Sequence, residues 1–255
     1  MMIKVILVFA FAAAFFVCPP AFASAKTHPE QFGGPALSRD DFNRLAVEAG
    51  LGLFWEADRN RSGTVEPGEL IPLGAGADLS AYVSGGFTKK FRDAYSRLVD
   101  MRRAETVKRE LDFGYPTVLA SDFRRASAAD RKVVEHVVAA GKIIERLYLK
   151  QKGAAALESK IPAGDDVARA LFNRNQGPWC EAPKTQEDPF CNAIASFPPK
   201  ISDAYPEGMR QDEAMCKSLR KMKDGKKLLD PFTVVRREGG KLVALPLTSV
   251  YGEEM

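Results

Sequence analysis

The spacing of apolar residues along the chain predicts a mainly α-helical protein with one small β element. Apolar residues recur every three or four positions in several segments, which is typical of one face of a helix. These segments cover residues 38–55, 88–110, 127–148, 165–172 and 211–223. Near the C-terminus the pattern changes. Residues 232–247, FTVVRREGGKLVALPL, contain two β-rich runs around Glu-Gly-Gly, which predicts a β-hairpin with a glycine turn.

Local capping signals mark the start of two of these helices. Ser38 precedes the first helix with Asp41 three residues later, and Ser127 precedes the third with Asp130 at the same spacing. We therefore expect both helices to begin at these serines. The third helix has the strongest apolar stripe, formed by Val133, Val134, Val137, Ile144, Leu147 and Tyr148.

The first 25 residues have the layout of a cleaved secretory signal. Lys4 precedes an apolar run from Val5 to Val17, and small residues in an A-x-A pattern follow at 21–23 or 23–25. The run is shorter than the roughly 20 residues that a membrane-spanning helix needs. We therefore expect residues 1–25 to be removed, the mature protein to be secreted or periplasmic, and no stable membrane insertion after cleavage.

The mature chain divides by composition into three parts. Residues 26–37 are rich in glycine, proline and polar groups, which predicts an extended lead-in. Residues 38–90 hold a loop of EF-hand type between an N-terminal helix and an irregular segment. Residues 91–255 are expected to form a helical domain that ends in the hairpin.

Residues 58–69, DRNRSGTVEPGE, match the pattern of an EF-hand calcium-binding loop. Such a loop places oxygen ligands at positions 1, 3, 5, 7, 9 and 12 and a glycine at position 6. The ligand positions hold Asp58, Asn60, Ser62, the Thr64 carbonyl, Glu66 and Glu69. Gly63 occupies position 6, and the apolar Val65 follows at position 8. We expect a Ca²⁺ site in which Glu69 offers both carboxylate oxygens, because a flexible set of about seven oxygens suits Ca²⁺ better than Mg²⁺.

Other features of the region indicate a weak, structural site rather than a calcium sensor. Arg59 and Arg61 lie between the three acidic ligands, so the loop has a formal charge of −1, which reduces its attraction for a divalent cation. Pro72 interrupts a helix after the loop, and the sequence contains no second loop of this pattern. We predict a dissociation constant of about 10⁻⁵–10⁻³ M. The alternative is a polar surface turn that binds no ion.

Composition and charge are those of an ordinary globular protein. The hydrophobic share is 45% and the charged share 27%, which is enough apolar material for a core. The net charge is +4, and Lys and Arg are spread along the chain with Asp and Glu among them. This pattern argues against a nucleic-acid partner.

The cysteines of the mature chain predict one disulfide. Cys180 and Cys191 bracket CEAPKTQEDPFC, whose two prolines help to bring its ends together, and thiols outside the cytoplasm tend to be oxidised. We expect a Cys180–Cys191 disulfide. Cys216 is then unpaired, either as a buried thiol or as the link of a dimer.

Short motifs from about residue 111 onward resemble the part of bacterial dipeptidyl-peptidase-III-like zinc peptidases that precedes their catalytic helices. The matching pieces occur in the family's order, as VLASDF, HVVAAGKIIERLYLKQ, NRNQGPW, YPEGM and FTVVRREGGKLVALPLTSVYGEEM. The resemblance implies a substrate-holding scaffold and hence a peptide or protein partner. It does not cover residues 38–90.

The zinc-binding residues of that family have no counterpart here. The family uses a histidine-glutamate motif on one helix, whereas this chain has only His28 and His136, and neither lies in such a motif. His136 is expected on a helix surface. Trp179 and Tyr205 have two interpretations, as the lining of a peptide groove or as core packing. We therefore predict no catalytic residue.

These observations favour an exported, non-enzymatic calcium-binding protein, in which calcium stabilises the fold or supports binding of a peptide or protein. The alternative is the non-catalytic half of a split zinc-dependent dipeptidyl-peptidase-like hydrolase, completed by a separate chain. A third possibility is a structural protein whose loop is never occupied.

Overall fold

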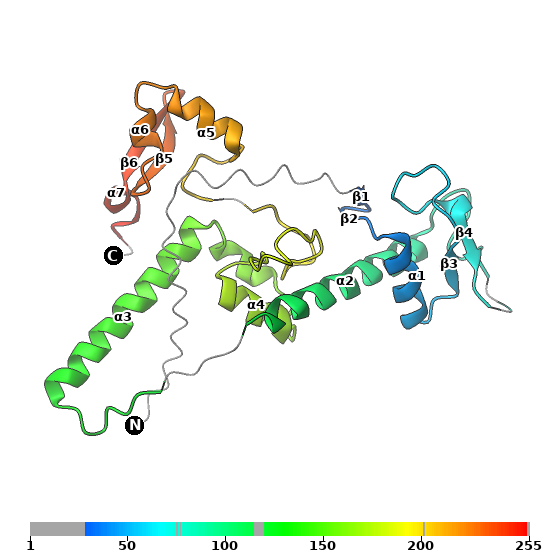
Figure 1. Ribbon diagram of the computed structural model, residues 1–255, viewed down its shortest axis with the longest axis horizontal. Helices are drawn as coiled ribbons and strands as arrows, with labels where there is room; N and C mark the ends of the chain where they lie inside the picture. Colours follow the sequence, from blue (N-terminus) through cyan, green and yellow to red (C-terminus); the bar gives the residue numbers. More distant parts are fainter. Residues whose placement is uncertain (1–28, 75, 77, 115–119, 201, 254–255) are drawn as a thin grey trace. The chain divides into compact units, whose positions relative to one another are not determined.

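The computed structural model describes residues 29–74, 76, 78–114, 120–200 and 202–253. The expected signal peptide and His28 lie outside these residues. The described chain forms two compact units, drawn in Figure 1. The first unit comprises residues 29–113 and 161–198, and the second unit comprises the remaining described residues. The boundary expected between residues 90 and 91 thus falls inside the first unit, near the start of a long helix.

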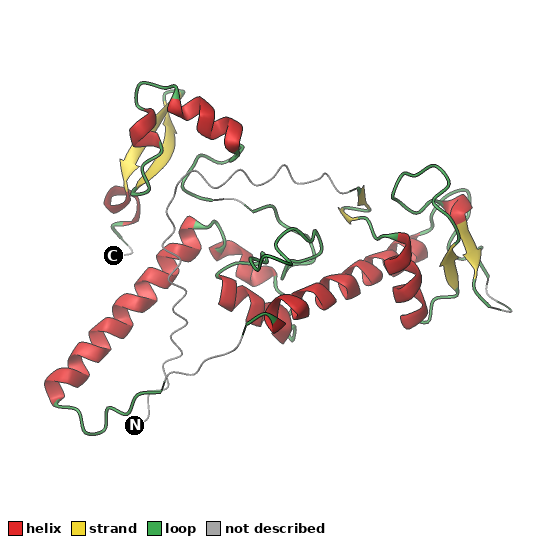
Figure 2. Ribbon diagram, in the orientation of Figure 1, coloured by secondary structure: helices red, strands yellow, loops and turns green. Residues whose placement is uncertain are grey.

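Helices and short antiparallel strand pairs make up the first unit (Figure 2). Its helices are α1 (Arg39–Glu48), α2 (Lys89–Asp112), α4 (Asp166–Asn175) and the 3-10 helix η1 (Pro67–Glu69). β1 (Glu30–Gln31) pairs with β2 (Gly34–Pro35), and β3 (Leu53–Trp55) pairs with β4 (Leu70–Pro72).

The core of the first unit forms around α1, which packs against both β3 and α2. The ring of Phe42 on α1 lies 6.0 Å from that of Trp55 and 6.4 Å from that of Phe91 on α2, measured between centroids. All three side chains are almost fully buried. The cap predicted at Ser38 is confirmed, because its hydroxyl accepts a hydrogen bond from the Asp41 backbone N–H at 3.1 Å.

The first helix ends earlier than its apolar pattern predicts. α1 stops at Glu48, Gly50 takes a positive φ of 68°, and Leu53–Trp55 is a strand rather than the last turn of the helix. Leu53 and Trp55 point into the core while Phe54 is only half-buried, which is the alternation of a strand. The expectation of a helix running to Trp55 is therefore wrong. The glycine turn lets the chain reverse, and pairing with β4 then satisfies the backbone.

The buried side chain of Arg103 connects α2 to residues 161–198. Arg103 donates to the Asp165 carboxylate at 2.9 Å and to the carbonyls of Asn192 and Ala193 at 3.2 Å. Its side chain is only 4% exposed, so these partners are needed to offset the cost of burying its charge. The expected helix near 165–172 is α4, with Asp165 as its N-cap.

The second unit contains α3 (Ala128–Gln151), the 3-10 helix η2 (Ala155–Lys160), α5 (Glu213–Arg220), α6 (Gly225–Leu228), β5 (Thr233–Glu238), β6 (Lys241–Pro246) and α7 (Leu247–Tyr251). The predicted hairpin is confirmed as β5 and β6, which pair from Thr233↔Pro246 to Glu238↔Lys241. Gly239 and Gly240 form its turn with φ of 55° and 80°. Two successive positive φ angles match the twist of the strands, and glycine adopts them without steric cost.

The long helix α3 begins at the predicted capping box, where Ser127 and Asp130 exchange hydrogen bonds. No residue of the described helix is buried, and Val133, Val137 and Ile144 on its apolar stripe are 60–65% exposed. His136 lies on this helix and is exposed to solvent, as expected. Within the described part of the chain, no helix combines the length and hydropathy needed to cross a membrane.

Candidate metal centre

The loop predicted to bind calcium connects the two strands of the β3–β4 pair. After Trp55 the chain curls through residues 56–66, enters η1 and returns as β4. The Glu56 N–H donates to the Glu69 carbonyl at 3.0 Å, which extends the strand pairing to the base of the loop. The loop is thus flanked by paired strands. The entering helix that the sequence indicated is absent from this part of the described chain, because α1 ends before Gly50.

Gly63 at position 6 is required both by its backbone angle and by its surroundings. Its φ is +70°, in the left-handed region that side chains disfavour. A Cβ built on it would lie 3.1 Å from Cγ of Pro29. The sharp turn here brings the residues before and after it face to face. Arg61 also has a positive φ, 59°, which adds to the curl of the loop.

The side chains at positions 1 and 3 accept hydrogen bonds from backbone N–H groups of the turn. The two carboxylate oxygens of Asp58 accept hydrogen bonds from the backbone N–H groups of Ser62 and Gly63, both at 3.0 Å. The Asn60 side-chain oxygen accepts from the same Ser62 N–H at 3.0 Å. Asp58 and Asn60 therefore share the Ser62 N–H as a donor, and Asp58 also binds the Gly63 N–H, which stabilises the curvature of the loop.

The oxygens at positions 5, 7 and 9 continue this arrangement. The Ser62 hydroxyl lies 3.0 Å from the Thr64 carbonyl oxygen, to which it donates. The Asn60 amide donates to the Glu66 carboxylate at 2.7 Å, across the loop. The structure thus brings five of the six predicted ligand residues into one hydrogen-bonded series. Asn60, Ser62 and Glu66 are exposed, so solutes reach this side of the loop.

Glu69, the predicted ligand at position 12, lies differently from the other five. Its side chain is buried, with 4% of the residue exposed. One carboxylate oxygen accepts from the Arg59 N–H at 2.7 Å, and the other accepts from the Trp55 indole at 3.0 Å and the Glu66 N–H at 3.2 Å. A carboxylate accepts about four hydrogen bonds, so these three donors leave room for one further contact. In this structure Glu69 ties both ends of the loop together.

The charge of Arg59 is partly offset by a residue outside the loop. Its guanidinium forms an ion pair with Glu56 at 2.8 Å, and both side chains are about half exposed or more. An exposed pair of this kind contributes little to stability. It does place a carboxylate beside the cationic group nearest to the start of the loop, so Arg59 repels an incoming cation less than the sequence suggests.

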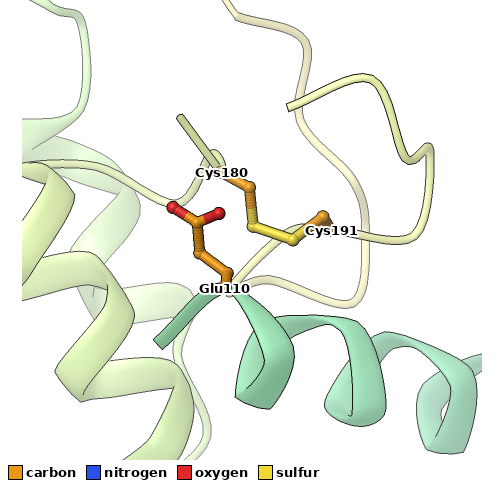
Figure 3. Close-up of side chains that lie close together, drawn as sticks. All are labelled: Glu110, Cys180 and Cys191. Carbon is orange, nitrogen blue, oxygen red and sulfur yellow. A yellow bond between two sulfur atoms is a disulfide. The ribbon is translucent and has the colours of Figure 1, made fainter. Parts of the chain in front are cut away.

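A second cluster of metal-type residues comprises Glu110, Cys180 and Cys191 (Figure 3). The two cysteines form the predicted disulfide, with Cα atoms 5.6 Å apart. Disulfide sulfurs are not thiolates and do not act as metal ligands in the way that free cysteines do. The prediction of a Cys180–Cys191 disulfide is confirmed. The further expectation that Cys216 is an unpaired thiol is wrong, because none of the described cysteines is free and Cys216 is itself disulfide-bonded.

The carboxylate of Glu110 is fully engaged by residues around the disulfide loop. It accepts hydrogen bonds from Arg174 at 2.5 Å, the Glu181 N–H at 3.1 Å, the Ala182 N–H at 3.2 Å and the Thr185 hydroxyl. Burial alone raises the pKa of Glu110, but the hydrogen bonds led by Thr185 outweigh it, so the pKa lies below its usual value. Glu110 is a structural anchor for residues 174–185.

Sequence reasoning missed Arg103 and Glu110. Both lie on the buried side of α2, at helical spacing with Val107 between them. A charged residue on an apolar helical face is the signal that indicates such an anchor, because a buried charge requires partners.

Of the two aromatic residues considered for a groove, Trp179 is buried and Tyr205 is partly buried against a core cluster. Trp179 is 7% exposed and donates from its indole to the Pro198 carbonyl at 2.8 Å. Tyr205 packs against the cluster around Cys216 and Leu228 in the second unit. The packing interpretation therefore holds for both side chains.

No protein-family model, curated protein or solved structure matches this chain. The resemblance to dipeptidyl-peptidase-III-like enzymes accordingly stays a prediction from short motifs.

Proposed function

We propose that the protein is an exported, non-enzymatic calcium-binding protein, in which one Ca²⁺ bound by residues 58–69 stabilises the first unit. The observation that supports this best is the hydrogen-bonded series of oxygens from Asp58 to Glu66 around the turn at Gly63. Carboxylate, amide, hydroxyl and carbonyl oxygens on a tightly curled loop are the ligands that Ca²⁺ prefers.

The flanking elements favour a structural role over a signalling role. A calcium sensor changes the angle between two helices and exposes an apolar groove. Here the loop leads from β3 into η1 and β4, and the strand pairing continues to its base. An ion at this site would hold the ends of a strand pair in place, since no pair of helices flanks the loop within the described residues.

The expected stabilisation follows from mass action. An ion that binds only the folded state adds RT ln(1 + [Ca²⁺]/Kd) to the free energy of unfolding. With a Kd of about 10⁻⁵ M and millimolar calcium this amounts to about 2.7 kcal/mol, and with a Kd of about 10⁻³ M it falls below about 0.5 kcal/mol. The first value is a large part of the stability of an ordinary domain.

Calorimetric titration of Ca²⁺ into metal-free protein tests the proposal, together with the melting temperature in chelator and in calcium. Glu66→Gln is the variant of choice, because Glu66 is exposed and its replacement removes a ligand charge with little effect on packing. Glu48→Gln is the matched control, since it makes the same change in net charge at an exposed position on α1, outside the loop. We expect Glu66→Gln to bind at least tenfold more weakly, and Glu48→Gln to stay within about threefold of the wild type. A wild-type protein that gives no heat and no melting shift in millimolar calcium would exclude the calcium site.

Two features of the chain support export from the cytoplasm. The signal-like N-terminus and the Cys180–Cys191 disulfide favour an oxidising compartment outside the cytoplasm. A peptide or protein partner rests on the resemblance to a substrate-holding scaffold alone. The split-peptidase alternative predicts zinc-dependent hydrolysis when a catalytic chain is added, and an assay with and without zinc separates it from the binding protein.

A further inference from the structure

One side chain outside the loop binds both backbone groups of its position-8 residue. The Gln31 amide nitrogen donates to the Val65 carbonyl at 2.6 Å, and the Gln31 amide oxygen accepts from the Val65 N–H at 3.3 Å. Val65 is 1% exposed, so its polar backbone groups have little access to water. Gln31 therefore satisfies groups that are costly to leave unpaired.

Because the peptide bond is planar, the hydrogen bond from the Val65 N–H to Gln31 also orients the Thr64 carbonyl, a proposed calcium ligand. The Thr64 carbonyl and the Val65 N–H belong to one peptide unit, which is trans because the described residues contain no cis peptide. In a trans peptide the carbonyl and the N–H point in opposite directions. Holding the Val65 N–H toward Gln31 turns the Thr64 carbonyl oxygen the other way, toward the Ser62 hydroxyl that donates to it at 3.0 Å. Gln31 thereby orients the backbone ligand at position 7.

Gln31 is itself held in place by a small N-terminal hairpin, residues 29–36. β1 and β2 pair antiparallel, and the Ala36 N–H donates to the Pro29 carbonyl at 2.8 Å. Phe32 and Gly33 form the turn with φ of 55° and 84°. Positive φ is unfavourable for a phenylalanine, and such strain persists only where the surroundings hold the residue.

The contacts of Phe32 supply that support. Its ring lies 5.2 Å from the ring of Tyr95, 5.6 Å from Phe87 and 6.0 Å from Phe91, all in edge-to-face geometry. This arrangement is favoured by the quadrupoles of aromatic rings. The hairpin is thus anchored to α2 through Phe32 and contacts the loop through Gln31, one residue earlier.

We propose that Gln31 is a positioning residue of the calcium loop, and that calcium binding is coupled to docking of the hairpin formed by residues 29–36. The inference rests on the proposed function. By linkage, a hairpin that orients the Thr64 carbonyl raises calcium affinity, and bound calcium stabilises the docked hairpin by the same factor. The ion would then fasten the segment that follows the predicted signal cleavage site onto the first unit.

Two variants of the full chain test the coupling between calcium binding and hairpin docking, with Ca²⁺ alone as the probe. Gln31→Met keeps the length of the side chain and removes both hydrogen bonds, and Phe32→Ala removes the aromatic anchor without touching the loop. Gln186→Met is the matched control, because it makes the same substitution at an exposed position of the same unit. We expect calorimetry to show calcium affinity weakened about tenfold by Gln31→Met, weakened also by Phe32→Ala, and unchanged by Gln186→Met.

Hydrogen exchange supplies a readout that a purely structural role of Gln31 would not change. In the wild type, calcium should slow exchange of the Ala36 amide, which reports hairpin pairing, as well as amides within the loop. In Gln31→Met the loop amides should still respond at saturating calcium, whereas the Ala36 amide should not.

The outcomes separate this inference from the calcium site itself. A wild type that binds no calcium overturns the proposed function, and the coupling with it. A wild type that binds calcium, with Gln31→Met and Phe32→Ala binding equally well, overturns only the role of Gln31 and leaves the site intact. If Gln31→Met does not fold, Phe32→Ala decides, since unchanged affinity in that variant contradicts the coupling.

Discussion

Glu69 is expected to stabilise the first unit even when no calcium is present. Its buried carboxylate accepts three N–H donors, from Trp55, Arg59 and Glu66, and so joins the start of the loop to its end. Replacement by alanine removes all three hydrogen bonds. The perturbation to make is therefore Glu69→Ala, measured in chelator so that loss of an ion plays no part.

The loss in the free energy of unfolding depends on whether each of the three N–H donors finds another acceptor after the substitution. A hydrogen bond to a charged group contributes about 1.5–3 kcal/mol, and a donor that is left buried and unpaired costs about 1–3 kcal/mol. The Trp55 indole keeps a second acceptor, the Ala57 carbonyl at 3.1 Å, and the N–H groups of Arg59 and Glu66 are only partly buried and can bind water. The loss should thus be smaller than the sum, about 2–4 kcal/mol. Glu69→Gln retains one acceptor oxygen and should cost about half as much.

Urea denaturation followed by tryptophan fluorescence measures this loss. The chain has two tryptophans, Trp55 and Trp179, and both lie in the first unit, so the signal reports that unit alone. Glu48→Ala is the control, because Glu48 is an exposed acidic residue on α1 and its loss should change stability by less than about 0.5 kcal/mol. If Glu69→Ala in chelator unfolds at the same urea concentration as the wild type, the loop-closing role is wrong. A fall in stability as expected means that Glu69→Gln is a poor test of calcium binding and that Glu66→Gln is the better one.

Three further changes have defined outcomes. Gly63→Ala should lower the free energy of unfolding by at least about 1 kcal/mol and weaken calcium binding, because alanine disfavours a φ of +70° and its Cβ meets Pro29. Thermal melting measures the loss of stability, and calorimetry measures the loss of calcium affinity. Serine at both Cys180 and Cys191 should cost about 3 kcal/mol in the same fluorescence assay, given the 11-residue separation; equal stability would show that the bridge constrains nothing. The folded-state pKa of Glu110 is lowered, so its stabilisation is present above its ordinary value of 4.5 and is lost as pH falls through the folded pKa. Glu110→Gln should therefore destabilise at neutral pH and flatten the decline below about pH 4.5, and unfolding curves at several pH values measure the difference.

Features that depend on neighbouring residues were predictable from the sequence. The N-caps at Ser38 and Ser127 and the glycine turn of the β5–β6 hairpin all formed as expected. In each case the decisive contacts lie within a few residues, as the Ser38 hydroxyl does to the Asp41 N–H. The Cys180–Cys191 disulfide belongs to the same group, since a short loop with two prolines brings its ends together.

The order of ligand-type residues in the loop could also be predicted from the sequence, but the strand pair that flanks the loop could not. Helical spacing favoured a helix through Trp55, and only the pairing of β3 with β4 shows that these residues form a strand. Strand pairing joins Trp55 to Leu70, which lies beyond the reach of a local pattern. For the same reason Glu69 reads as a ligand in the sequence, whereas the fold buries it among the donors of Trp55, Arg59 and Glu66.

The sequence by itself determined where the helices capped by Ser38 and Ser127 begin, where the C-terminal hairpin turns and which oxygens the loop offers, because those properties depend on side chains close together along the chain. The tertiary structure alone decided which groups hold that loop. Gln31 reaches Val65 across 34 positions, and Glu110 reaches Thr185 across 75. Such contacts form only when burial of the core brings distant segments together and leaves their polar groups no water to bind.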